Sequence, residues 1–291
     1  MAEEINGNFK RKKVIIISLL IALISAVAWV SYSWYMRTYI STDDAYIAGR
    51  IHIVAPKIAG TVASVYVSDN QYVKTGDLLL EIKPEDYEVR VKQASTTMAA
   101  EKSNMKKAEL DFQRAEKLLK TQAVSQAYYD QAKTSYDTSS SLVKQKEAML
   151  QEAKLNISYT KIYSPVEGYV TRKSVEVGDQ LRPGQPVMAV VPLQDVWIIA
   201  NYKETQLTRV KAGQKVRIKV DTYPGKVYEG RVDSIMAGTG SVLSMFPPEN
   251  ATGSFVKVVQ RIPVKITLIN GNDPQHLLRA GMSVVSTIII E

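Results

Sequence analysis

The chain has 291 residues, with 37 lysines and arginines against 29 aspartates and glutamates, and a formal net charge of +8. It contains no cysteine and only two histidines, which excludes disulfide frameworks, cysteine-ligated metal centres, thiol nucleophiles and multi-histidine metal sites. A hydrophobic fraction of 45% and a charged fraction of 23% are typical of globular proteins, so the chain is expected to fold.

The first predicted element is a transmembrane helix over residues 14–36, after a cytoplasmic N-terminus over residues 1–13. No charged residue interrupts this run, and about 20 apolar residues cross a hydrocarbon core of about 30 Å. Lysine and arginine occupy residues 10–13, so the positive-inside rule places the rest of the chain outside the cytoplasm. The alternative is a cleaved signal peptide, but the run exceeds an apolar region of about 7–15 residues.

Residues 37–53 are predicted as a linker and strand, and two similar stretches follow at residues 54–84 and 158–192. Their glycines match at a constant offset, Gly60 with Gly168 and Gly76 with Gly184. Each stretch alternates apolar and polar residues over short runs, which predicts short antiparallel strands. Because one half alone leaves an apolar face exposed, the two halves are predicted to form one small β-sandwich.

Between these halves, residues 85–157 contain neither glycine nor proline, although the chain has 15 glycines and 11 prolines. Because these two residues are the worst helix formers, the segment is predicted to form an antiparallel coiled-coil hairpin. The predicted seam of the first helix is Tyr87, Val91, Ala94, Met98, Glu101, Met105, Ala108, Phe112, Ala115 and Leu119. Ser125 is expected to cap the second helix. Its predicted seam is Tyr128, Ala132, Ser135, Ser139, Leu142, Lys146, Met149 and Ala153.

Residues 193–291 are predicted to form a small β-barrel. The pattern of short alternating runs bounded by glycine, proline and asparagine predicts strands at residues 216–220, 227–235, 255–259, 264–269 and 283–290. The fold class expected from the whole chain is therefore mixed α+β: one N-terminal transmembrane helix, a split sandwich interrupted by a helical hairpin, and a C-terminal barrel.

Both halves of the repeat resemble the biotinyl/lipoyl fold. Each opens on Ala-Pro or Ser-Pro followed by Gly-x-Val, and each later carries Val-Lys-x-Gly or Leu-Arg-x-Gly. Carrier proteins of that family present a modified lysine in the turn between the halves. Here Lys83 occupies that turn, but Pro84 follows it and a long helix begins. Lys83 would have to carry the modification, and its surroundings do not suit that role. The biotin- or lipoyl-carrier alternative is therefore disfavoured.

Split lipoyl halves around a hairpin, after an N-terminal anchor, resemble the HlyD-type membrane fusion proteins. The stretches 41–47 and 196–207 are similar to EmrA-like multidrug efflux adaptors. The resemblance implies a periplasmic adaptor, anchored in the inner membrane, that links a transporter to a TolC-like outer-membrane channel. It also implies a homo-oligomer (trimer or hexamer), contact with membrane lipid, a major-facilitator transporter, and drugs or toxic compounds as cargo. An adaptor for an ABC-type (type I) secretion system is the alternative. No cofactor and no nucleic-acid partner are expected.

Adaptors of this family resemble one another at the hairpin tip in an R-x3-L-x6-S pattern, which Arg114, Leu118 and Ser125 match. The resemblance implies that these three residues contact the outer-membrane channel. Judged from the residues alone, Arg114 could instead be a solvated flank of the coiled coil, Leu118 an edge of its seam and Ser125 only a helix cap. The glycine- and proline-rich stretch 236–254 contains Leu243, Met245 and Phe246. Two interpretations of this stretch stay open: a mobile surface loop, or a contact with the transporter.

Two further functions are weighed against the adaptor. One is an envelope protein that uses the coiled coil for assembly and exports nothing. The other is an enzyme, for which the paired carboxylates Asp43 and Asp44 are the only candidates. Adjacent residues of a strand point to opposite faces, so these two carboxylates are not expected to converge on one substrate.

Overall fold

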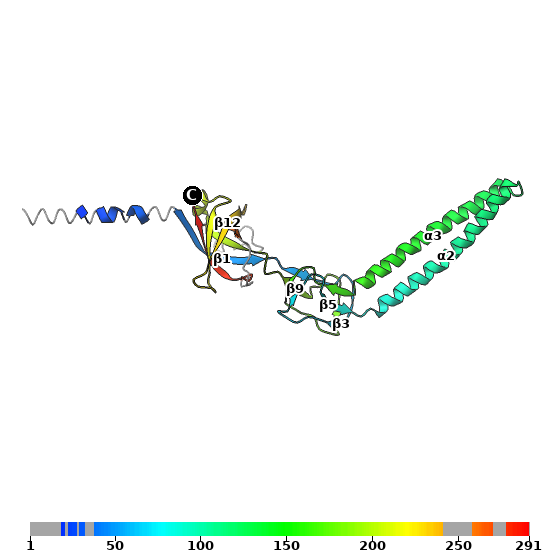
Figure 1. Ribbon diagram of the computed structural model, residues 1–291, viewed down its shortest axis with the longest axis horizontal. Helices are drawn as coiled ribbons and strands as arrows, with labels where there is room; N and C mark the ends of the chain where they lie inside the picture. The colour runs from blue at the N-terminus through cyan, green and yellow to red at the C-terminus, as the bar shows by residue number, and fades with distance from the viewer. Residues whose placement is uncertain are drawn as a thin grey trace, which may run out of the picture. The chain divides into compact units, whose positions relative to one another are not determined.

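Figure 1 shows the computed structural model. It describes residues 19–20, 23–27, 29–32, 38–240, 258–269 and 278–290. The chain forms two compact units, of which one is Ile51–Val191 and the other combines the described residues up to Arg50 with those from Pro192 onwards. The first unit holds a β-sandwich and two long helices, and the second holds a closed barrel. The mixed α+β class with a helical hairpin and a barrel is confirmed.

Six strands close the barrel in the order β1-β10-β13-β12-β11-β14. They are β1 (Tyr39–Gly49), β10 (Val196–Lys203), β11 (Lys215–Val220), β12 (Val227–Ile235), β13 (Arg261–Leu268) and β14 (Ser283–Ile289). Strict alternation of exposed and buried residues along β11 follows from its alternating sequence. Inward side chains from all six strands form the barrel core, including Ile47, Ile198, Ile218, Val232, Ile266 and Ile288.

The barrel core also contains one buried polar pair. The Tyr202 hydroxyl lies 2.8 Å from Ser286 Oγ and 3.2 Å from the Ser286 carbonyl oxygen. Burial raises the pKa of the Tyr202 hydroxyl above its ordinary value, so it stays protonated and can donate to these acceptors. The pair therefore satisfies polar groups that would otherwise be costly inside the barrel.

Two strand predictions in the barrel need correction. The strand predicted at 264–269 begins three residues earlier, at Arg261, because Pro263 fits into it opposite Asn201. Proline is rare in the interior of strands, so the sequence pattern predicts that this strand begins after Pro263. The strand predicted at 255–259 is wrong at Val258 and Val259, which lie outside any strand, and its residues 255–257 are outside the described part.

The sandwich consists of two four-stranded sheets, β2-β9-β7-β4 and β6-β5-β3-β8. From the first half come β2 (His52–Val54), β3 (Gly60–Val65), β4 (Tyr72–Val73) and β5 (Leu78–Ile82). From the second half come β6 (Lys161–Tyr163), β7 (Gly168–Thr171), β8 (Gln180–Leu181) and β9 (Met188–Val191). Each sheet takes two strands from each half, so neither half can form a sheet of the sandwich without the other.

The register of the sandwich reproduces the sequence repeat. Gly60 lies opposite Leu181, and Val73 lies opposite Gly168. In the repeat, Gly60 corresponds to Gly168 and Val73 to Leu181, so each pairing is the equivalent of the other. A Cβ at Gly60 would lie 2.5 Å from Ile82 Cγ2, which explains why this position of the first half is glycine. The prediction of one sandwich made from two split halves is confirmed.

The hairpin is formed by α2 (Glu85–Lys120) and α3 (Gln126–Ser158), which run side by side in Figure 1. Pro84 precedes α2, and acidic residues fill its first turn, where negative charge complements the helix dipole. All ten predicted seam positions of α2 are buried or half-buried, with Ala108 and Ala115 the most buried. The heptad predicted for the first helix is confirmed.

Three of the eight seam positions predicted for α3 are wrong. Ala132, Ser139, Leu142, Lys146 and Ala153 are half-buried as predicted, but Tyr128, Ser135 and Met149 are exposed. The residues that follow these three, Tyr129, Tyr136 and Leu150, are half-buried instead, and Val143 is more deeply buried than its neighbour Leu142. The packing reason is Phe112 of α2, whose ring stacks on Tyr136 with centroids 5.8 Å apart and contacts Tyr129 at 5.5 Å.

About half of the predicted transmembrane helix lies outside the described residues. Within its range, residues 19–20, 23–27 and 29–32 are described and helical. No helix of the described chain has both the length and the apolar character needed to cross a membrane.

Candidate functional site

The hairpin tip, defined here as residues 114–128, is built on the aromatic contact beneath it. α2 ends at Lys120, and the Gln122 N–H donates to the Leu119 carbonyl oxygen at 2.9 Å. The Ala123 N–H donates to the Leu118 carbonyl oxygen, also at 2.9 Å. These two bonds form a Schellman motif, in which a left-handed residue reverses the chain after a helix. Gln122 supplies that residue, with φ of 57°.

The three residues predicted for the tip all lie on its solvent-exposed surface. Leu118 is 42% exposed and points out of the seam, which its neighbour Leu119 occupies. Arg114 lies one turn before Leu118 and donates to Asp111 Oδ1 at 2.6 Å. This pair is exposed on both sides, so it contributes little to stability, and the guanidinium keeps further donors.

Ser125 is the N-cap of α3, as the sequence predicted. Its hydroxyl accepts a hydrogen bond from the Tyr128 N–H at 3.3 Å, in the extended backbone conformation that N-caps adopt. The structure thus brings Leu118 and Ser125 onto one compact turn. The capping role is shown, whereas a contact of Ser125 with a channel remains a prediction.

Sequence reasoning missed two residues of the tip. Tyr128 was placed in the α3 seam, but its side chain is 53% exposed and adds an aromatic ring to the surface near Ser125. The adjacent Tyr129 satisfies the seam equally well by pattern, so the pattern alone could not separate them. Gln122 was missed because glycine, not glutamine, is the usual signal of a left-handed residue after a helix.

Gln122→Gly is expected to stabilise the tip by about 0.5–1 kcal/mol, because glycine adopts positive φ without a steric cost. Slower hydrogen exchange at the amides of residues 118–128 is the measurement. The matched control is Gln131→Gly in the interior of α3, which should lower helix stability by about 1 kcal/mol. Faster exchange at the tip of the Gln122 variant would contradict the assigned turn.

The other predicted sites stand as follows. Leu243, Met245 and Phe246 lie outside the described residues. Asp43 and Asp44 fall where the β1–β14 register shifts, at an irregularity between Thr42 and Ala45. Asp44 there accepts a hydrogen bond from Asn201 at 3.0 Å and pairs with Arg261 at 3.0 Å. These partners give Asp44 a structural role that ties β1 to β10 and β13.

Carrier and metal chemistry find no support in the described residues. Lys83 follows β5, and only Pro84 separates it from α2, so the turn that presents the lysine of a carrier here continues into the hairpin. Within the part of the chain that the structure describes, no group of three or more histidine, aspartate or glutamate side chains could hold a metal ion.

Comparison with known proteins decides the family. Residues 50–193 match the family model described as the RND MFP barrel-sandwich hybrid domain, and residues 195–241 match the CusB-like beta-barrel domain. The chain is 31% identical to the probable multidrug resistance protein EmrK of Escherichia coli, over 98% of this chain and 87% of that protein. The chain belongs to the membrane fusion protein family.

Further comparisons agree with this membership. The multidrug export protein EmrA of Escherichia coli is 32% identical over 88% of this chain and 78% of that protein. The crystal structure of MacA from Actinobacillus actinomycetemcomitans superposes with a TM-score of 0.64 at 25% identity, covering 88% of this chain and 80% of that one. Membrane fusion proteins are adaptors, so this chain is a non-enzymatic adaptor whose named relatives serve multidrug efflux.

Proposed function

We propose that this membrane fusion protein is the periplasmic adaptor of a tripartite pump that exports drugs or toxic compounds. Its partners would be an inner-membrane transporter, of the major-facilitator type, and a TolC-like outer-membrane channel. The observation that carries the proposal is the hairpin inserted between the interlocked sandwich halves, in a chain similar to EmrK along 98% of its length. The apolar run at residues 14–36 contains no charged residue that could relay protons, so the transporter would supply the energy.

The tip is the proposed contact with the channel. Leu118 and Tyr128 offer exposed apolar surface, and Arg114 offers a planar donor beside them. Protein interfaces favour such a combination of aromatic, aliphatic and arginine side chains. The Schellman turn and the Ser125 cap would hold these groups on a rigid support, which lowers the entropy lost on docking.

The N-terminal segment is the proposed membrane contact. Leu19, Leu23 and Trp29 are helical and between 65% and 72% exposed, which is unfavourable in water and favourable in lipid. The lysine and arginine residues at 10–13 would keep the N-terminus cytoplasmic and the rest periplasmic. Leu243, Met245 and Phe246 would add a contact with the transporter, and several copies would assemble as a trimer or hexamer.

Deletion of the gene tests the proposal. The deletion strain is expected to accumulate a panel of toxic compounds and to become more sensitive to them, with recovery when the full chain is supplied in trans. Affinity purification of the full chain from membranes should also recover a multi-span transporter. Unchanged accumulation of every compound, together with no recovered transporter, would favour a purely structural envelope protein.

A further inference from the structure

The sandwich carries a groove at the seam between its two sheets. β2 is the outer strand of one sheet and β6 is the outer strand of the other, and the groove lies against both. Its volume is about 560 Å³, within the range of about 300–1,000 Å³ usual for small-molecule sites. Ala55 and Pro165, from the openings of the two repeat halves, both line it, and the end of α3 adds Ser158 and Tyr159.

The groove is predominantly apolar. Val54 is a buried core residue beneath it, Ile162 is half-buried, and Ile53 leaves two thirds of its surface exposed at 66%. An isoleucine exposed beside an apolar groove is unfavourable in water, because removing apolar surface from water lowers the free energy. The surroundings therefore favour an apolar body as the occupant.

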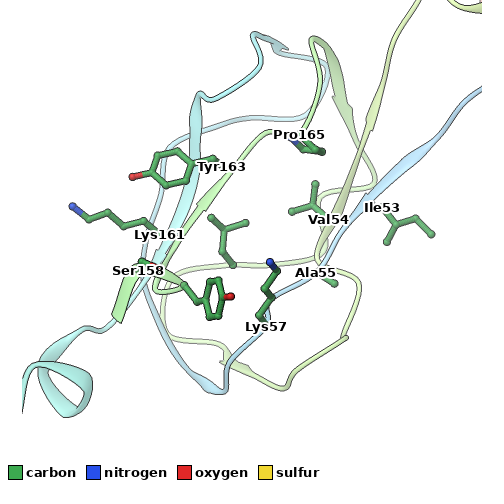
Figure 2. A pocket seen from close by; sticks show the side chains of 10 residues that line it. Ile53, Val54, Ala55, Lys57, Ser158, Lys161, Tyr163 and Pro165 are labelled. Atoms are coloured by element: carbon green, nitrogen blue, oxygen red, sulfur yellow. The ribbon is translucent and has the colours of Figure 1, made fainter. Parts of the chain in front are cut away.

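The charged residues of the groove indicate which kind of ligand it would bind. The only charged residues that line the groove are Lys57 and Lys161, and no carboxylate lines it. Lys161 already has Glu81 at 3.8 Å, and Figure 2 shows Lys161 and Tyr163 extending away from Lys57. Lys57 has no carboxylate partner among the described residues; its ammonium lies over the Tyr159 ring, 4.6 Å from the centroid. One cation is thus held at the groove by an aromatic ring.

We propose that this groove binds a small organic anion with an apolar, aromatic body, whose charge pairs with Lys57. The apolar body would cover Ile53 and Ile162, and the anionic group would face the ammonium beside Tyr159. The proposal stands apart from the export function, because binding is measured on the adaptor alone, without transporter or channel. If Lys57 only stabilised the C-terminal end of α3 through the helix dipole, its substitution would lower the stability of the protein. It would not change which ligand the groove binds more tightly.

The probes are naphthalene-2-sulfonate and its neutral analogue naphthalene-2-sulfonamide, which differ in charge but hardly in shape. Equilibrium dialysis against the full chain in lipid nanodiscs gives their dissociation constants, with binding to empty nanodiscs subtracted. The sulfonate is expected to bind saturably and more tightly than the sulfonamide. Lys57→Met keeps an apolar stem over Tyr159, and it should weaken the sulfonate about fivefold, the scale of one exposed charge pair.

Two further variants locate the site. Ile53→Asp places a negative charge on an exposed position of the groove, so it should fold and weaken the sulfonate more than the sulfonamide. Lys74→Met removes an exposed lysine of the same unit away from the groove and should change neither constant. No saturable binding by the wild type, or a sulfonate constant unchanged in Lys57→Met, would overturn the proposal. So would binding that falls as protein concentration rises, since a second copy would then cover the groove.

Discussion

Leu118→Asp is expected to abolish export while the protein remains folded and membrane-associated. Leu118 is 42% exposed and lies outside the seam, so an aspartate there is solvated in the free adaptor. In the docked state the same carboxylate would be buried against the channel without a partner. A cost of about 3 kcal/mol at each copy corresponds to more than about a hundredfold in affinity. Accumulation of a fluorescent efflux substrate in intact cells measures the loss.

Leu110→Asp is the matched control for this prediction. Leu110 is a leucine of the same helix with a similar exposure of 40%, about 12 Å nearer the base. It should leave export unchanged. Ser125→Asp is a companion variant, because aspartate still caps α3 and yet adds charge to the tip. Normal export in both tip variants, or equal loss in Leu110→Asp, would contradict docking through the tip.

Gly230→Ala is expected to have the largest effect on the barrel. A Cβ at Gly230 would lie 2.8 Å from Ile218 Cδ1, 2.9 Å from Ile266 Cγ2 and 2.9 Å from the Thr267 carbonyl oxygen. The two side chains are packed in the core, and the carbonyl belongs to the neighbouring strand β13, so none can yield freely. Overpacking of this kind costs about 3 kcal/mol. Faster hydrogen exchange in β12 and β13 measures it.

Gly49→Ala is the control, because its Cβ would meet only ordinary contacts, the nearest at 3.5 Å from Val196. It should change exchange in the barrel little, within about 0.5 kcal/mol. Exchange in the sandwich unit should stay the same in both variants, since the three atoms nearest to each added methyl group belong to the barrel unit. Unchanged exchange of β12 in Gly230→Ala would show that the barrel is looser than its packing indicates.

The hairpin illustrates how far sequence pattern determines structure. The α2 seam was predictable because its apolar residues recur at heptad spacing with polar residues between them. In α3 the adjacent pairs Tyr128–Tyr129 and Leu142–Val143 are apolar at both positions, so periodicity could not choose between them. Phe112 makes the choice through its contacts with Tyr129 and Tyr136. Such packing between helices leaves no trace in the spacing of either one.

The β units show the same division. The repeat offset identified the two halves, because equivalent glycines meet equivalent turns and close approaches. It could not reveal that each sheet draws two strands from each half, since that pairing depends on contacts between distant segments. At the candidate tip, Arg114, Leu118 and Ser125 were found because they match the pattern of the membrane fusion proteins that the chain resembles. The left-handed Gln122 and the exposed Tyr128 became visible only with the turn and the α3 register.

Site-specific cross-linking in intact cells tests the central proposal most directly. Because the chain has no cysteine, Leu118→Cys carries a single attachment point for a photoreactive maleimide at the tip. Lys92→Cys carries the same group at an exposed site about 39 Å nearer the base of α2. The adaptor account predicts that the tip variant captures an outer-membrane channel, identified by mass spectrometry, and that the Lys92 variant does not. Capture of no channel from the tip, or equal capture from both positions, would contradict it.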